Sequence, residues 1–113
     1  MTAFADRLVE AVRAHETPLC AGLDPFPDKI PELFGAKNSI GALRGFCEAI
    51  IAIAPKHAGV MKPQLGLFEQ YGPEGYAVAA DMVRAARNAG LVTILDAKRG
   101  DIGTTAEGYV RAT

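Results

Sequence analysis

The sequence predicts an α/β fold: an N-terminal helix followed by three repeats of strand, loop and helix. Three short apolar runs alternate with longer stretches whose apolar residues recur at helical spacing. Each run is apolar almost without interruption, which is typical of parallel strands with helices packed outside them. The chain has 113 residues with no shift in composition and no linker, so residues 1–113 are expected to belong to a single domain.

The first third of the chain is predicted to contain one helix and the first strand. Thr2 is a candidate N-cap, and an apolar stripe at helical spacing runs from there to about His15. Residues 19–23, LCAGL, form a short apolar run that indicates a buried strand. After a proline-containing break, residues 28–34 predict a short helical turn with Pro31 in its first turn.

The middle of the chain predicts a long helix and the second strand. Ser39 is expected to cap the helix, which Pro55 ends. Residues 60–68, VMKPQLGLF, predict the strand and its exit loop, and Pro63 is an unusual residue inside a strand. The apolar face of the helix is expected to consist of Ile40, Leu43, Phe46, Ile50 and Ile53.

The last third predicts another helix, the third strand and the start of a further helix. The helix is expected over residues 73–89, with a proline at its first position and Gly90 after its end. Residues 91–97, LVTILDA, give the clearest strand. Thr104 and Glu107 have the spacing of a capping box at the start of a helix. The inward face of helix 73–89 is expected to include Val78, Met82 and Ala85.

Each predicted strand brings a charged side chain to its carboxyl end. Side chains alternate between the faces of a strand, so Asp24 extends one face of the first strand and Lys62 lies late in the second. Asp96 and Lys98 share a face of the third strand. Ligands of parallel α/β sheets and barrels bind at the carboxyl ends of the strands. These residues are therefore a candidate site, and a structural salt-bridge cluster is the alternative.

Two architectures fit this order of elements, a doubly wound sheet and a (β/α)8 barrel. No glycine-rich phosphate-binding motif follows the first strand, which weakens the dinucleotide-binding version. No His, Cys and carboxylate cluster has the spacing of a metal site, so no metal is expected. We interpret His15 and His57 as surface or capping residues, Arg99 as a solvated or ion-paired loop residue and Thr104 as a helix cap.

Composition excludes several classes of protein. The 12 basic and 13 acidic residues give a net charge of −1 without any block of one sign, which argues against nucleic acid or an anionic membrane as the main partner. No apolar run approaches the roughly 18 residues of a membrane span. The first residues lack the apolar core of an export signal. Cys20 and Cys47 are expected to be buried and reduced, so a cytoplasmic location is the simplest expectation.

Three segments together resemble one enzyme family. They are AGLDP at residues 21–25, KPQLGLFEQYGPEG at residues 62–75 and DAKRGDIGTTAEGY at residues 96–109. The last contains the pattern D-x-K-x-x-D of orotidine 5′-phosphate decarboxylases, and the surroundings resemble their second bacterial branch, of the mycobacterial type. The resemblance covers essentially the whole chain. It implies a (β/α)8 barrel, here the N-terminal helix and first three βα units, and no cofactor.

The resemblance also implies a reaction and a role for each charged residue. The reaction is decarboxylation of orotidine 5′-phosphate to uridine 5′-phosphate in pyrimidine biosynthesis. Lys98 would donate a proton to carbon 6 of the pyrimidine, and Asp96 would sit beside the substrate carboxylate. Lys62 would join Asp96 and touch the ribose, whereas Asp24 would bind ribose hydroxyls.

A homodimer is implied as well. In the family, the position of Asp101 reaches into the site of the partner subunit, accompanied by those of Ile102 and Thr105. The same D-x-K-x-x-D pattern occurs in related sugar-phosphate decarboxylases and synthases, which tend to use magnesium with a Glu near the end of the second strand. In this chain Pro63 and Gln64 follow Lys62.

The family barrel has eight strands in about 250 residues, and this chain supplies three. The loops after the seventh and eighth strands, which usually bind phosphate, lie outside it, as does the family's phosphate-binding arginine. We therefore expect the chain to be the N-terminal part of a longer enzyme and to be inactive alone. A non-catalytic half-barrel is the remaining alternative.

Overall fold

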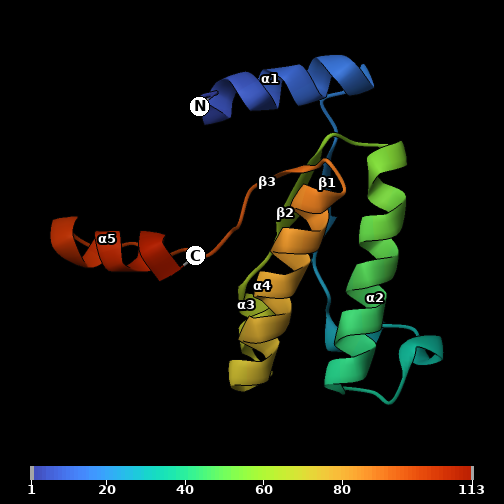
Figure 1. The fold of residues 1–113 in the computed structure, drawn as a ribbon. Coiled ribbons are helices and arrows are strands. Elements are labelled where there is room, and N and C mark those ends of the chain that lie inside the picture. The colour runs from blue at the N-terminus through green and yellow to red at the C-terminus, as the bar shows by residue number, and fades with distance from the viewer. Residues whose placement is uncertain (1, 113) are drawn as a thin grey trace.

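The computed structural model describes residues 2–112, which form a three-stranded parallel sheet with helices packed on it (Figure 1). The strands are β1 (Cys20–Leu23), β2 (Val60–Pro63) and β3 (Val92–Thr93), in the order β1-β2-β3. The helices are α1 (Phe4–His15), α2 (Ile40–Ile53), α3 (Gly66–Glu69), α4 (Gly72–Asn88) and α5 (Gly103–Ala112). The predicted order of a helix and three strand–helix repeats is confirmed.

The ends of the helices follow some of the sequence signals and not others. Ser39 caps α2 as predicted, because its hydroxyl accepts a hydrogen bond of 3.1 Å from the amide of Ala42. Thr2 does not cap α1, whose N-cap is Ala3 without a side-chain hydrogen bond. Thr104 lies inside α5, which begins at Gly103, two residues earlier than a capping box at Thr104 requires. The predicted turn at 28–34 is two short 3₁₀ turns, Pro27–Lys29 and Glu32–Phe34.

The third strand is shorter than the predicted residues 91–97. Its backbone continues to bond β2, since the amides of Ile94 and Asp96 donate to the carbonyls of Met61 and Pro63 at 2.9 and 3.0 Å. A parallel ladder also needs the amide of residue 63 to donate to the carbonyl of Ile94. Proline has no N–H, so this rung is lost and regular pairing stops after Val92–Thr93.

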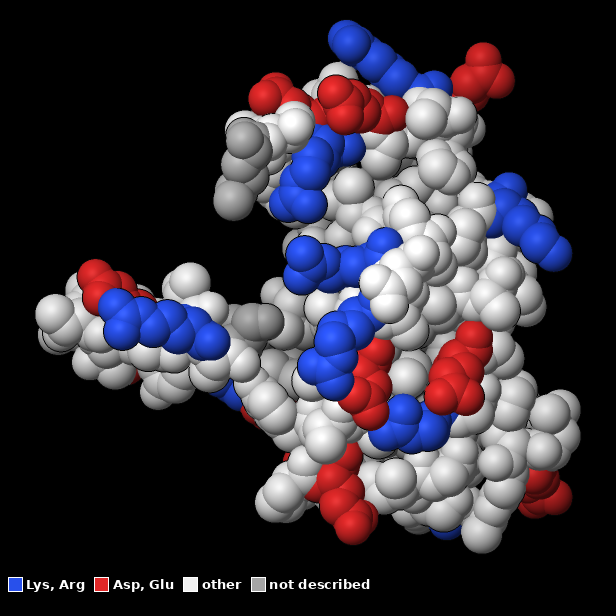
Figure 2. Space-filling model, in the orientation of Figure 1, with Lys and Arg blue, Asp and Glu red and all other residues white. Residues whose placement is uncertain are grey.

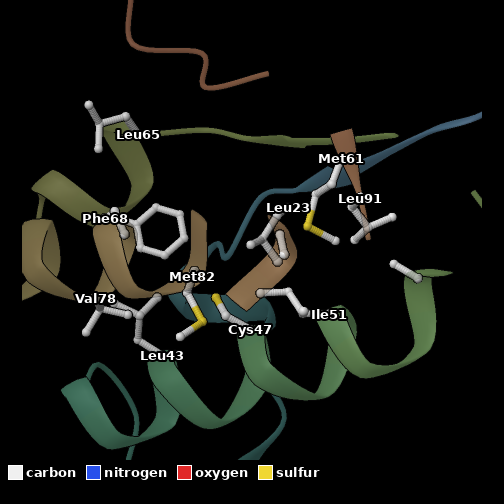
Figure 3. Close-up of a cluster of buried hydrophobic side chains, with 13 residues drawn as sticks. Leu23, Leu43, Cys47, Ile51, Met61, Leu65, Phe68, Val78, Met82 and Leu91 are labelled. Carbon is white, nitrogen blue, oxygen red and sulfur yellow. The ribbon is translucent and has the colours of Figure 1, made fainter. Parts of the chain in front are cut away.

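The hydrophobic core lies between the sheet, α2 and α4 (Figure 3). Met61 of β2 and Phe68 of α3 are fully buried in it. The face that α2 buries is displaced from the predicted one: Ile53 is 52% exposed, and the buried positions follow each other at intervals of four residues. These positions are Leu43, Cys47 and Ile51, next to Ala42.

The other face of the sheet is open along β1. Cys20, Gly22 and Asp24 are exposed, as is Ile94 beyond β3. Helix α1 lies across the end where the strands begin, and α5 projects away from the sheet with none of its residues buried (Figure 1). The prediction that Cys20 is buried is therefore wrong, because its side chain lies on the face opposite to the helices. Cys47 is buried as predicted.

The two thiols are expected to differ sharply in reactivity. Burial, and then the charge of Glu48, raise the pKa of the Cys47 thiol to about 12, so it stays protonated at neutral pH and is a poor nucleophile. A disulfide reagent at pH 8 should therefore modify Cys20 rapidly and Cys47 only after addition of denaturant. Rapid reaction of both thiols in the native chain, or of neither, would contradict this arrangement of the sheet.

Charged side chains of both signs are interspersed on the face seen in Figure 2 (Figure 2). None of the helices within residues 2–112 is long and apolar enough to cross a membrane.

Candidate active site

Strand register brings three polar side chains together at the carboxyl end of the sheet. Gly22 pairs with Lys62, and an isolated bridge pairs Gln64 with Asp96. Residues 62 and 64 point to the same face of β2, and Asp96 of the neighbouring segment lies beside them. This is the face that the helices leave open. The predicted convergence of Lys62 and Asp96 at one edge is therefore present.

Asp96 is the centre of this group. The Nζ atom of Lys98 lies 2.6 and 2.7 Å from its two carboxylate oxygens, which is the bidentate geometry of a charge-assisted hydrogen bond. The amide of Gln64 donates to Oδ2 of Asp96 at 3.0 Å, and Nζ of Lys62 lies 3.6 Å from the same oxygen. The Asp96 side chain is only 23% exposed, whereas that of Lys98 is 74% exposed.

These contacts keep Asp96 ionised. The hydrogen bond from Lys98 is the largest influence and lowers the pKa of Asp96 below its ordinary 3.8; the Gln64 amide and both ammonium charges act in the same direction, against partial burial. Because the pKa is lowered by folding, the pairing stabilises the folded chain fully at neutral pH. That stabilisation is lost as the pH falls through the lowered pKa.

A backbone turn allows Lys98 to reach Asp96. Lys98 has φ 48°, in the left-handed region that residues other than glycine rarely adopt. The prediction that the strand alternation continues to Lys98 is wrong, since the chain leaves the ladder after Asp96 and turns. The turn places two side chains that are two residues apart in direct contact.

Within residues 2–112, no hydrogen bond or ion pair joins the other predicted site residues to Lys98. Asp24 is exposed just after β1, and its carboxylate lies over Gly22, the register partner of Lys62, where a Cβ atom on Gly22 would be 3.0 Å from Oδ1 of Asp24. Asp101 accepts a hydrogen bond of 2.8 Å from the amide of Ile102, at the start of α5. Ile102 is 79% exposed, and Thr105 is exposed in the first turn of α5. All three residues are therefore exposed.

Gln64 is a member of the site that the sequence did not predict. An uncharged amide carries no chemical signal by itself, and only the register with Asp96 shows its contact. Arg99 is an ion-paired loop residue as predicted, and its partner is Glu69 of α3. His15 has a structural role, since its ring nitrogens lie 3.0 and 3.2 Å from the carbonyl oxygens of Ala11 and Pro55. Residues 2–112 contain no group of three or more potential metal ligands.

Comparison with known proteins identifies the family. Residues 17–113 match the family described as orotidine 5′-phosphate decarboxylase / HUMPS. Among curated proteins, the orotidine 5′-phosphate decarboxylase of Myxococcus xanthus is 39% identical over 106 residues, which are 94% of this chain and 36% of that protein. The enzyme of Salinispora arenicola is 38% identical over 112 residues, which are 99% of this chain and 40% of that protein.

Solved structures give the same result. A candidate orotidine 5′-phosphate decarboxylase from Streptomyces avermitilis superposes with a TM-score of 0.89 at 36% identity, covering 99% of this chain and 39% of that one. The OMP decarboxylase of Leishmania donovani gives a TM-score of 0.73 at 36% identity, covering 96% and 38%. The α/β fold is thus that of the first three βα units of a (β/α)8 barrel, and the chain spans about two fifths of the relatives that it matches. The chain belongs to the orotidine 5′-phosphate decarboxylase / HUMPS family.

Proposed function

We propose that this chain supplies the Lys and Asp residues of an enzyme that decarboxylates orotidine 5′-phosphate to uridine 5′-phosphate. The observation that carries the proposal is the contact of the Lys98 ammonium with both oxygens of Asp96, with Lys62 as a second cation beside them. Membership of the family supports the substrate and the reaction.

Lys98 has the chemistry that this reaction needs. When the bond between carbon 6 of the pyrimidine and the carboxylate breaks, carbon dioxide leaves and its electron pair stays on carbon 6. A fixed ammonium stabilises that negative charge as it forms. It then transfers a proton from Nζ to carbon 6, which leaves a neutral amine that solvent reprotonates. Asp96 holds the Lys98 ammonium in position before the reaction through a charge-assisted hydrogen bond to both of its oxygens.

The remaining charges bind and orient the substrate in this proposal. The carboxylate of Asp96 lies beside the leaving carboxylate, and their repulsion is relieved when carbon dioxide departs. Lys62 contacts Asp96 and the ribose, and Asp24 accepts hydrogen bonds from ribose hydroxyls. The phosphate is bound by segments outside residues 1–113.

A homodimer completes the site. Asp101, Ile102 and Thr105 lie on or before the projecting helix α5 and are exposed. We propose that they enter the active site of a second subunit, where the carboxylate of Asp101 approaches the partner's Lys98.

Contacts of Glu69 support this reaction over that of a magnesium-dependent sugar-phosphate enzyme. That alternative needs a carboxylate near the end of the second strand that is free to bind the cation. Glu69 is the acidic residue that follows β2, and it is ion-paired with Arg99.

The 113-residue chain alone is expected to be inactive. The Lys98 side chain is 74% exposed, and water screens a charge that catalysis needs in a dry, closed site. A suitable test is a chimera in which residues 1–113 replace the matching segment of the Salinispora arenicola enzyme, which is 38% identical.

Release of labelled carbon dioxide from carboxyl-labelled orotidine 5′-phosphate is expected with the chimera and not with the chain alone. The chimera should also restore growth without uracil to a bacterium that lacks its own decarboxylase. A folded, dimeric chimera that binds uridine 5′-phosphate but releases no carbon dioxide would contradict the proposal, and turnover by the isolated chain would contradict the expected inactivity.

A further inference from the structure

Arg99 links three separate parts of the chain. Its guanidinium forms an ion pair with Glu69, the last residue of α3. A second nitrogen, Nη1, donates a hydrogen bond of 2.7 Å to the carbonyl of Ala97. The guanidinium carbon lies 6.0 Å from the ring centroid of Tyr109 in α5, within the range of a cation–π contact. The loop after β3 is thereby attached to α3 and to α5.

The bond from Arg99 to Ala97 spans Lys98. A left-handed conformation at a residue with a side chain costs about 1–2 kcal/mol and persists only where the surroundings hold it. Arg99 closes a turn around Lys98 by bonding the carbonyl on its other side. Glu69 fixes the guanidinium from a different element, so that the turn is attached to the body of the protein.

Packing does not hold Lys98 in place. Its side chain is 74% exposed, and its hydrogen bonds go to Asp96. By contrast, the side chains of Arg99 and Glu69 are 31% and 35% exposed, which makes this a half-buried ion pair. The position of the ammonium therefore depends on the backbone turn at Lys98, and the turn depends on Arg99 and Glu69.

We propose that Arg99 and Glu69 are positioning residues that hold Lys98 in the left-handed turn and so keep its ammonium on Asp96. The inference deepens the proposed function, in which Lys98 is the proton donor. Neither Arg99 nor Glu69 has to touch the substrate; they act through the backbone of Lys98. Asp101 lies two residues after Arg99, so the contacts of Arg99 also fix the direction in which the chain continues toward α5.

The variant Glu69→Gln separates this role from a simple charge effect. Removing the negative charge of Glu69 could by itself only make ionisation of Asp96 easier and lower its pKa. If Glu69 instead anchors the turn, its loss releases Lys98 from Asp96, and the pKa of Asp96 rises. Carbon-detected NMR titration of the Asp96 carboxyl in the 113-residue chain measures the direction without any assay of activity.

A second variant and a matched control complete the experiment. Arg99→Lys keeps the positive charge but loses the planar fork that reaches Glu69 and Ala97 together, so the pKa of Asp96 is again expected to rise. Asp81→Asn is the control, because it neutralises the acid of another half-buried ion pair, formed with Arg44 at 2.7 Å. This variant should not raise the pKa of Asp96. A lowered or unchanged pKa of Asp96 in both variants would overturn the proposal.

Kinetics of the chimera give the second readout. Glu69→Gln and Arg99→Lys are expected to lower kcat by about 10- to 100-fold with little change in KM, because a misplaced proton donor slows chemistry more than binding. A rise in KM with unchanged kcat would overturn the proposal. If the unmodified chimera were inactive, the proposed function would fail, and the NMR titration would still test the positioning role.

Discussion

Replacing Lys98 with alanine in the chimera is expected to lower kcat by about 10³-fold or more. The substitution removes both the charge that stabilises the carbanion and the proton that quenches it, and either loss alone typically costs about 10²-fold or more. Binding of uridine 5′-phosphate should persist, because the ribose and phosphate are held by other groups. Single-turnover release of carbon dioxide and calorimetric titration with the nucleotide measure the two effects separately.

Lys37→Ala is the matched control for Lys98→Ala. Lys37 also forms an ion pair, with Asp28 at 2.8 Å, but it lies on the surface between the 3₁₀ turns and α2. The Lys37→Ala variant should leave kcat within about twofold, since exposed ion pairs contribute little to stability. Turnover by Lys98→Ala equal to that of the control would exclude Lys98 as the proton donor.

Replacing Gly75 with alanine is expected to destabilise the chain by about 3 kcal/mol or more, at the upper end of the cost of overpacking. Gly75 is buried in α4, where a Cβ atom would overlap the backbone carbonyl of Phe68 and lie 2.6 Å from Cβ of Tyr71. A backbone carbonyl cannot rotate away as a side chain can. Helix α3 would have to move. Phe68 would then shift in the core, and so would Glu69, which forms the ion pair with Arg99.

Gly66→Ala is the control for Gly75→Ala. Gly66 is the first residue of α3, and a Cβ atom there meets nothing within 4 Å. Alanine favours a helix over glycine by about 1 kcal/mol, so this variant should be neutral or more stable. Urea denaturation of the 113-residue chain measures both. Equal stability of the two variants would contradict the close packing of α3 against α4.

Local signals predicted the elements that depend on local chemistry. The Ser39 cap, the apolar run of β1 and the stop near Gly90 each rest on a few adjacent residues, and all are present. Sequence signals failed where the packing of helices or the pairing of strands decided the structure. Cys20 is apolar, but it lies on the open face of the sheet. The third strand is shortened by Pro63, a residue of its neighbour in space.

The same division applies to the site. The rule that ligands bind at the carboxyl ends of parallel strands was enough to predict that Lys62 and Asp96 share an edge. It could not predict the turn at Lys98, because the left-handed conformation is held by Glu69, 29 positions before it in the sequence. Nor could it find Gln64, whose contact with Asp96 depends on the register of two strands.

A crystal structure of the chimera with bound uridine 5′-phosphate would show directly whether Lys98 is placed to donate a proton to the pyrimidine. Nζ of Lys98 is expected to lie about 3–3.5 Å from carbon 6 of the pyrimidine, the separation of reacting atoms, while it keeps its contact with Asp96. A nucleotide bound with carbon 6 away from Lys98, or a Lys98 side chain turned away from Asp96, would contradict this placement.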